Sequence, residues 1–182
     1  MDATAGLIGE KGIDSVTMRD IARSIDAPLS VIYQYFPNKS AIVEMLYARF
    51  TEQTHAETVQ ATTGIKTSAE FLDVIDDLLE RYHGLMRAQP LAADVVTAVL
   101  ADKKLRHLDV EDSHRHADSI AAAGRKFVSA DKQDEFERLM FLFAHLIGGL
   151  MRLLLDSDDK SARIILDDYK RIFRNQFQLF FN

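Results

Sequence analysis

The 182-residue sequence has no cysteine and no tryptophan, and it has only 3 prolines and 8 glycines. The missing cysteines exclude disulfides, thiolate zinc sites, iron–sulfur clusters and cysteine nucleophiles, and they fit a reducing, cytoplasmic compartment. The few prolines and glycines argue against collagen-like and linker-dominated chains. A composition of 47% hydrophobic and 27% charged residues is that of a globular protein that buries a core.

Targeting signals are also lacking, because the chain opens with acidic and small polar residues rather than a basic start and an apolar run. The most apolar stretch, 139–155, is interrupted by His145 and Arg152 and falls short of the roughly 18 apolar residues of a membrane span. We interpret it as a buried helix and expect no membrane partner. The net charge of −6 argues against broad polyanion binding, but a whole-chain sum can hide a local basic patch.

The first residues carry the start and stop signals of two helices. Gly12 is a natural left-handed stop for a first helix over 2–11. Thr17 caps a second helix over 18–24, because Asp20 lies three residues further on and apolar residues follow at helical spacing.

A tight corner and two more helices follow. Asp26 tolerates the left-handed turn conformation at 25–27, and Pro28 is suited to the first turn of a third helix over 28–35. Asn38 then caps a fourth helix. Apolar residues at the facing positions are expected to pack the second helix on the third, namely Ile21, Ala22, Ile25 and Ile32.

The rest of the chain predicts longer helices and no strand. Weak periodicity in the Ala- and Thr-rich stretch 57–66 indicates a seam between two subdomains. A more polar stretch covers 104–127. Helices are expected to begin at Ser68, Pro90, Ser129 and about Asp159, where Asp158 and Asp159 are interpreted as a cap.

The corner at 25–27 has the spacing of a helix-turn-helix unit, in which the second helix enters the major groove of DNA. Gln34 can hydrogen-bond a base edge, Ser30 can reach a base or a phosphate, and Val31 can touch a thymine methyl. Phosphates can be contacted by Thr17, Tyr33, Tyr35 and Lys39. The alternative on spacing alone is a plain helical corner in an unrelated bundle.

Residues 2 to about 50 resemble the DNA-binding domain of the TetR family of transcriptional repressors. The resemblance is carried by Asp2-Ala3, Leu7-Ile8, Gly12, Thr17, Asp20-Ile21-Ala22, the block Ile32-Tyr33-Gln34-Tyr35-Phe36, and Lys39. It implies an all-α fold of about nine helices, with a three-helix DNA-binding domain over 1–52 and a larger helical domain over 53–182. That larger domain would hold an inducer and dimerise through its last two helices. The implied contacts of a homodimer to a palindromic operator come from Thr17, Ser30, Val31, Tyr33, Gln34, Tyr35 and Lys39.

The sequence departs from the family pattern at the corner, where Ile25-Asp26-Ala27-Pro28 stands in place of the usual Ala-Gly-Val-Ser, followed by Leu29 and Ser30. The first fifty residues also carry a net charge of −1, with five Lys and Arg against six Asp and Glu. This balance is poor for a DNA-binding protein, because phosphate neutralisation supplies most non-specific affinity. We expect that the chain has lost a basic lead and that restored upstream residues would raise the affinity.

The expected regulatory domain contains a helix, 136–155, that is apolar nearly all round, and a partner subunit is its natural cover. Gly148-Gly149 fits close helix crossing, room for a ligand, or simple tolerance. A pocket for a small hydrophobic molecule would be lined by Phe71, Ile75, Tyr82, His83, Met86, Val96, Leu100, Phe143 and His145. Ordinary core packing is the alternative for each of these residues.

No cofactor or metal is assigned. His107, Glu111 and His114 fall on one helical face near His116 and Asp118, and they could bind a divalent ion or form a solvated polar face. An enzyme is disfavoured because the sequence has no Gly-rich phosphate loop, nucleophile motif or convincing acid/base pair. The expected function is a ligand-responsive repressor, and the alternative is a helical adaptor or ligand-binding protein that has lost DNA binding.

Overall fold

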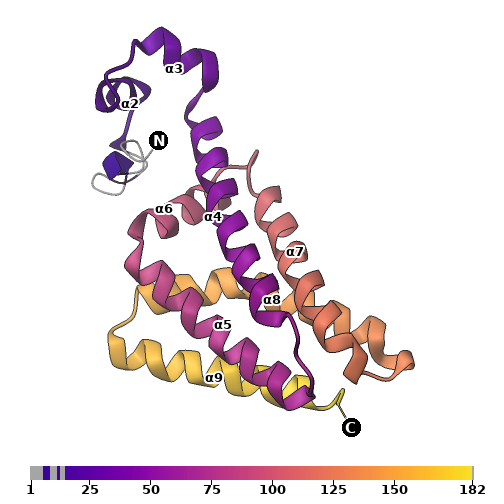
Figure 1. The fold of residues 1–182 in the computed structure, drawn as a ribbon. Helices are drawn as coiled ribbons and strands as arrows, with labels where there is room; N and C mark the ends of the chain where they lie inside the picture. Colours follow the sequence, from indigo (N-terminus) through magenta and orange to yellow (C-terminus); the bar gives the residue numbers. More distant parts are fainter. Residues whose placement is uncertain (1–5, 9–11, 13–14, 182) are drawn as a thin grey trace. The chain divides into compact units, whose positions relative to one another are not determined.

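The computed structural model describes residues 6–8, 12 and 15–181, and within these ranges the chain is helical without strands (Figure 1). The expected all-α class is confirmed; the first helix, over 2–11, lies mostly outside the described residues. The chain forms two compact units. Unit 1 comprises residues 1–52 and 89–109, and unit 2 comprises 53–88 and 110–182. Both this division and the predicted one break after Glu52, but 89–109 join the first unit.

Unit 1 is built on α2 (Met18–Ser24) and α3 (Leu29–Tyr35). Thr17 caps α2 as expected, since its Oγ1 accepts from the Asp20 N–H at 3.2 Å and the Asp20 carboxylate accepts from the Thr17 N–H at 3.0 Å. Asp26 adopts φ 51° at the corner. Pro28, expected as the first residue of α3, is instead its N-cap, with φ −59° and ψ 138°.

The packing of α2 on α3 agrees with the sequence at three of four positions. Ile21, Ala22 and Ile32 are buried. The expectation for Ile25 was wrong, because this side chain is 40% exposed. Ile25 follows the last turn of α2 as its C-cap, with non-helical backbone, so it leaves the face that Ile21 and Ala22 share. The remaining core of unit 1 comes from α4 (Lys39–Thr62), α6 (Pro90–Ala101) and the segments beside them, and includes Ile42, Val43, Leu46, Tyr47, Val95, Val99 and Leu105.

Helix α4 (Lys39–Thr62) gives its first part to unit 1 and its remainder to unit 2. The predicted seam at 57–66 was therefore wrong over 57–62, which are helical. Four threonines face inward at positions three and four apart, so the stretch lacks apolar periodicity without lacking a buried face. The buried threonines are Thr51, Thr54, Thr58 and Thr62.

A left-handed Gly64 (φ 80°) ends this segment before α5 (Ser68–Ala88). The cap of α5 is Thr67 rather than the predicted Ser68, since Thr67 Oγ1 accepts from the Glu70 N–H at 3.1 Å. The Glu70 carboxylate accepts in turn from the Lys66 N–H at 2.7 Å. Helix α6 (Pro90–Ala101) opens at Pro90 as expected.

Unit 2 contains α5, most of α7 (His107–Gly124), α8 (Gln133–Leu155) and α9 (Asp159–Gln178), with short 3-10 turns at Arg125–Phe127 and Ala130–Lys132. Asp158 caps α9 as expected, accepting from the Lys160 and Ser161 N–H groups at 3.1 Å. The core of the unit is dense in phenylalanine. Phe71, Phe136 and Phe177 are almost wholly inaccessible, and their rings meet edge to face or tilted at 5.5–6.1 Å.

Ion pairs line the contact of α5 with α9. Arg174 bonds Asp73 and Asp76, each at 2.6 Å, and these hydrogen bonds raise the pKa of its guanidinium above the usual value. Glu80 pairs with Arg163 at 2.8 Å and with Lys170. Burial raises the pKa of Glu80, but the Lys170 hydrogen bond and the nearby positive charges outweigh it, so the pKa lies below its usual value.

The expectation that the apolar stretch of α8 is a buried helix holds only at its two ends. Its buried residues are Phe136 and Met140 at one end and Leu150, Met151 and Leu154 at the other. Between them Leu142 and Leu146 are 47% and 50% exposed. The segment Ala130–Leu155 is long and apolar enough to cross a membrane by length and composition, although only 22% of its most apolar window is buried inside the chain.

Candidate functional site

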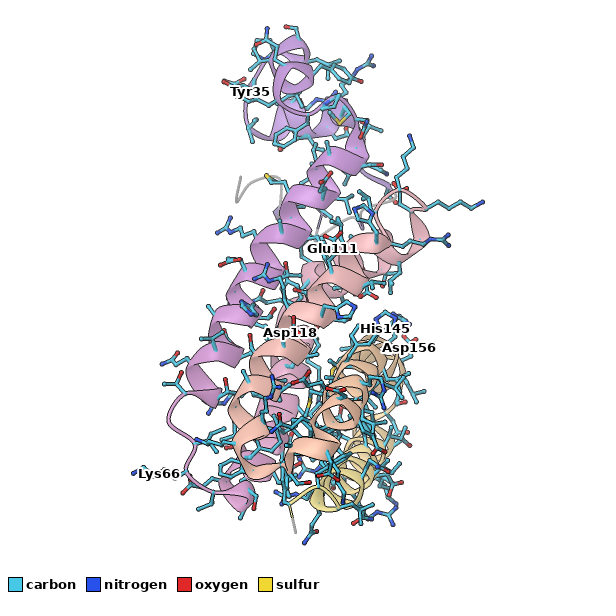
Figure 2. The ribbon with its side chains drawn as sticks, turned by 90° about the vertical axis from the view of Figure 1, so that its right-hand side faces the viewer. Tyr35, Lys66, Glu111, Asp118, His145 and Asp156 are labelled. Carbon is cyan, nitrogen blue, oxygen red and sulfur yellow. The ribbon has the colours of Figure 1, made fainter. Side chains whose placement is uncertain are left out.

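The outer face of α3 carries the residues expected to meet DNA. Ile32 is buried and fixes the helix to unit 1, and the three positions that follow it are exposed. Tyr33 is 48% exposed and Tyr35 is 75% exposed, with Tyr35 on the outer side of the helix pair (Figure 2). Ser30 and Gln34 are exposed and Val31 is partly buried. The seven-residue helix therefore presents hydroxyl, amide and methyl groups together, the groups that read base edges and phosphates.

Thr17 is exposed, but its hydroxyl is already engaged. It accepts from the Asp20 N–H and donates to the Asp20 carboxylate at 2.6 Å. A phosphate contact from this hydroxyl would replace the donation to Asp20, while the cap could persist. Lys39 stands at the first position of α4, where Asn38 Oδ1 accepts from the Ala41 N–H at 3.0 Å. The positive end of the helix dipole lies at this terminus.

The turn after α6 is tied to the same terminus of α4. Ser40 Oγ donates to Asp102 Oδ2 at 2.7 Å, and the other carboxylate oxygen of Asp102 accepts from the Lys104 N–H at 2.8 Å. The backbone hydrogen bond from Lys104, followed by that from Ser40, lowers the pKa of Asp102. Leu105 is buried in the core of unit 1, so the turn is anchored at two points.

The predicted ligand-lining residues are distributed over both units. Phe71, Ile75 and Met86 are fully buried in unit 2, and Tyr82 and Phe143 pack against its core cluster. The Phe143 ring contacts Tyr169, Phe173 and Phe177 at 5.4–5.8 Å. Val96 and Leu100 belong to unit 1. Whether these nine residues line one common pocket therefore remains a prediction.

Two histidines of that set have defined surroundings. His145 Nδ1 lies 3.0 Å from Ser113 Oγ, and its ring stacks beside Phe141. His83 Nε2 is buried and makes no hydrogen bond to any of the described residues. Burial, followed by the charge of Arg87, lowers the pKa of His83. A neutral imidazole with an unused ring nitrogen can bond one polar group of a small molecule.

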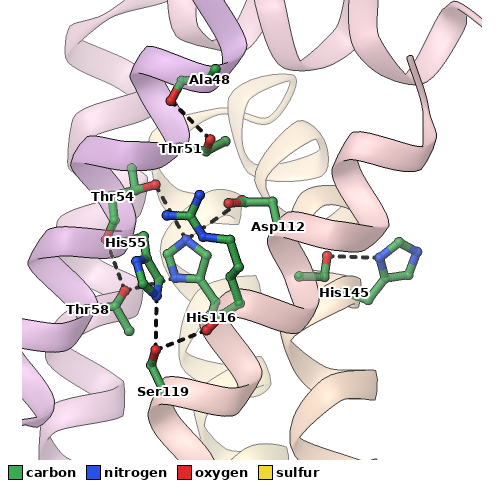
Figure 3. Close-up of polar contacts among 11 residues, drawn as sticks. Ala48, Thr51, Thr54, His55, Thr58, Asp112, His116, Ser119 and His145 are labelled. Carbon is green, nitrogen blue, oxygen red and sulfur yellow. Dashed lines mark hydrogen bonds and ion pairs between the residues drawn. The ribbon is translucent and has the colours of Figure 1, made fainter. Parts of the chain in front are cut away.

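A second polar cluster joins α4 to α7, and the sequence did not predict it (Figure 3). Thr58 Oγ1 donates to the Thr54 carbonyl at 3.0 Å, so it accepts from His116 Nδ1–H at 2.9 Å. The ring of His55 meets His116 edge to face at 5.5 Å and bonds Ser119 Oγ at 2.9 Å. These contacts enclose the His116 imidazole between α4 and α7.

Burial is the main cause that lowers the pKa of His116 to about 4, and the charges of His55 and Arg115 act in the same direction. The Asp112 carboxylate lies 3.7 Å from Nε2 of the same ring. His116 was expected on a polar, solvated stretch. The signal that could have found it is the adjacent run Ala117, Ile120 and Ala121, which marks the buried face of α7.

The possible metal face over 107–118 does not assemble. No group of three or more His, Asp or Glu side chains is placed to hold a metal ion in the part of the chain that the structure describes. The ring of His114 instead stacks on Phe141 at 3.8 Å, with an interplanar angle of 8°. Glu111 and Asp118 are exposed along α7 (Figure 2).

Comparison with known proteins identifies the class of protein to which the helix pair α2–α3 and the helical core of unit 2 belong. Residues 1–46 match the family described as bacterial regulatory proteins, tetR family. Residues 69–181 match the family described as the tetracyclin repressor-like C-terminal domain. Together the matches cover both units, and the helix-turn-helix head is that of a transcriptional regulator. The chain belongs to the TetR family.

Two relatives illustrate the likeness. The chain is similar to the HTH-type transcriptional repressor KstR of Mycolicibacterium smegmatis, at 28% identity over 97 residues. That match spans 53% of this chain and 46% of the repressor, so less than half of that protein is represented. The fold is similar to the crystal structure of a TetR-family transcriptional regulator from Pectobacterium atrosepticum, with a TM-score of 0.68, 12% identity and coverage of 99% and 91% of the two chains.

Proposed function

We propose that this protein is a ligand-responsive transcriptional repressor that acts in the cytoplasm, binds a palindromic operator as a homodimer and is released by a small hydrophobic inducer. The observation that carries the proposal is the outward face of α3, where Tyr33, Gln34 and Tyr35 stand free of the core while Ile32 holds the helix in place. A recognition helix needs this division between anchored and exposed positions.

The contacts proposed for DNA fall into two kinds. Gln34 reads a base edge and Val31 meets a thymine methyl. Tyr33, Tyr35 and Lys39 bond phosphates and fix the register of the head, with Thr17 and Ser30 at its border. This sorting predicts that Gln34 determines sequence preference, while Lys39 determines affinity for any duplex.

The experiment is selection of operator sequences from a random duplex library by the purified full chain. A palindromic consensus is expected, because a homodimer presents two equal heads. The Gln34→Ala variant should relax the preference at one position of each half-site and keep its affinity for unrelated duplexes. Recovery of no enriched sequence would contradict the repressor and favour the alternative, a helical protein that has lost DNA binding.

The homodimer is proposed through the exposed faces of α8 and α9. Leu142, Leu146 and Leu153 follow one stripe of α8, and each is about half exposed in the single chain. Ile172 of α9 and Leu179, the C-cap of that helix, are 55% and 59% exposed and lie seven positions apart. Rows of exposed apolar side chains are usually covered by a partner, and a second copy of the chain would supply matching apolar rows.

Gly149 supports the same interface. A Cβ added at this position would meet only the far end of Arg152, at 3.7 Å, so no packing within the chain requires a glycine there. The residue is exposed on the leucine stripe of α8. Close approach of a partner helix gives this glycine a function.

The inducer site is proposed in unit 2 around Tyr82 and His83, with Phe71, Ile75, Met86, Phe143 and His145 as the wider lining. The buried Nε2 of His83 is the polar group that would orient an otherwise apolar molecule. A thermal-shift screen of apolar molecules that each carry one hydrogen-bonding group tests this site. Ligands that stabilise the wild type should lose most of their effect in His83→Leu, and an equal shift in both proteins would place the inducer elsewhere.

A further inference from the structure

A short turn of unit 1 concentrates positive charge beside the start of α4. Lys103, Lys104 and Arg106 lie within four consecutive positions and are all exposed. They are three of the eight Lys and Arg residues of unit 1, whose other cations are spread over 52 residues. We call residues 102–106 the basic turn.

The fold holds this turn in place. Its backbone closes on Asp102, whose carbonyl accepts from the Leu105 and Arg106 N–H groups at 2.9 and 3.0 Å. The Leu105 side chain points inward and is buried, while its three cationic neighbours remain in solvent. Such a turn loses little further conformational freedom when its side chains bind an anion.

The basic turn is also tied to the DNA-facing end of α4. Asp102 accepts from Ser40 Oγ at 2.7 Å, and Ser40 directly follows Lys39, the proposed phosphate contact. Consecutive Cα atoms are about 3.8 Å apart, so the Cα of Lys104 lies within about 8 Å of that of Asp102. Phosphates on one DNA strand repeat about every 3.4 Å along the helix axis. A DNA strand whose phosphates contact Lys39 therefore continues within reach of the cationic side chains of the basic turn.

We infer that the basic turn is a second DNA-binding surface, which contacts backbone phosphates next to those bound by α3 and Lys39. The inference rests on the proposed DNA-binding function and extends it to residues outside the helix-turn-helix. It also answers a question of charge. The first fifty residues have a net charge of −1, whereas the turn, with three cations and Asp102, has a net charge of +2. Its cations add to the few in the first fifty residues that can neutralise phosphates.

The test measures binding to a fluorescein-labelled 30-base-pair duplex of random sequence over a series of NaCl concentrations, by anisotropy with the full chain. The turn variant is K103Q/K104Q/R106Q. Each phosphate contact contributes about 0.9 to the slope of log affinity against log salt. A dimer that loses one to three contacts per subunit should show a slope shallower by about 2 to 5, with weaker binding at every salt concentration.

Three further variants separate the explanations. R81Q/K132Q/K160Q removes three exposed cations from unit 2 and should leave the slope unchanged. K103R/K104R/R106K keeps the charge and should retain the wild-type slope, which identifies an electrostatic role. Lys39→Gln removes the phosphate contact proposed at the start of α4 and should weaken binding by itself. Equal melting curves by circular dichroism establish that each variant is folded.

The outcomes are distinct. A turn variant that matches the unit 2 control while Lys39→Gln weakens binding overturns the basic turn and leaves the DNA-binding function standing. A wild type that shows no salt-dependent binding, with Lys39→Gln indistinguishable from it, overturns the DNA-binding function and the turn together. A slope that is reduced in the turn variant and kept in both the unit 2 control and the charge-retaining variant supports the inference.

Discussion

At the scale of single residues, Gly124 at the end of α7 is the most tightly enclosed of the glycines tested in the described part of the chain. A Cβ there would lie 2.8 Å from ring atoms of both Phe71 and Phe136. Both rings are fully buried and packed against other aromatic rings, so neither can move aside without disturbing the core. This glycine is required by space rather than by backbone conformation.

We predict that Gly124→Ala lowers the free energy of unfolding by about 1 to 3 kcal/mol, the usual range for overpacking a core. Gly84→Ala is the matched control, because Gly84 lies inside α5 with nothing within 4 Å of its added Cβ. That variant should gain about 0.5 to 1 kcal/mol from the better helix propensity of alanine. Urea unfolding of both variants checks the pair, and equal effects would contradict this packing.

His116 gives a prediction about pH. Its pKa is lowered to about 4 in the folded chain from 6.5, so the unfolded chain binds a proton that the folded chain refuses. The folded state is favoured fully above pH 6.5 and loses about 3 kcal/mol as the pH falls from 6.5 to about 4. His116→Asn keeps a donor toward Thr58 but does not titrate. Its unfolding free energy should fall less steeply over this interval.

The control for this prediction is His107→Asn, because His107 is an exposed histidine. The quantity to compare is the change in unfolding free energy between pH 6.5 and 4.5 for each variant and the wild type. The same acid dependence in wild type and His116→Asn would show that His116 is not held neutral by the fold.

At the scale of elements, local signals in the sequence predicted helix boundaries well. Thr17 with Asp20, Asp26, Asn38, Pro90 and Asp158 each begin or end a helix through hydrogen bonds or backbone angles of their own neighbourhood. Features that depend on distant residues were missed. The threonine face of α4 is buried and His116 is enclosed because α4 and α7 meet, and no pattern within either segment states that they do.

The candidate site shows the same difference between local features, which the sequence predicts, and contacts between distant residues, which it does not. The exposed residues of α3 were predicted because the helix-turn-helix is a local unit, whereas Ile25 was misplaced where the helix ends. The α3 face and the basic turn are far apart in sequence, and it takes the Ser40–Asp102 hydrogen bond and the buried Leu105 to show that the turn belongs beside α4. Two expectations for α8 came from the sequence, a buried helix and an apolar surface in need of a cover, and the half-exposed Leu142 and Leu146 agree with the second at the centre of the helix.

The leucine stripe of α8 gives the element-scale prediction. Leu146→Arg should convert the homodimer to monomer, since it places a charge in the centre of an apolar interface. The monomer itself should stay folded, because Leu146 is 50% exposed in the single chain. Val59→Arg, on the 43% exposed face of α4, is the control and should remain dimeric. Sedimentation velocity distinguishes these states, and a dimeric Leu146→Arg protein would remove α8 from the interface.

At the scale of the whole molecule, the two units divide the proposed work. Unit 1 holds the reading helix, the start of α4 and the basic turn, and unit 2 holds the aromatic core, the unused nitrogen of His83 and the exposed stripes of α8 and α9. Helix α4 contributes to both units through one uninterrupted run of residues. The inducer would act by changing the relative population of dimers able and unable to hold two half-sites.

The measurement that tests this account most directly is native mass spectrometry of the full chain mixed with its selected operator duplex. The account predicts one duplex bound by two chains, with a protein mass of about 41 kDa from twice 20.6 kDa. An inducer found by thermal shift should dissociate that complex and remain bound to the protein. Single chains on the duplex, or protein that never retains it, would contradict a dimeric operator-binding repressor.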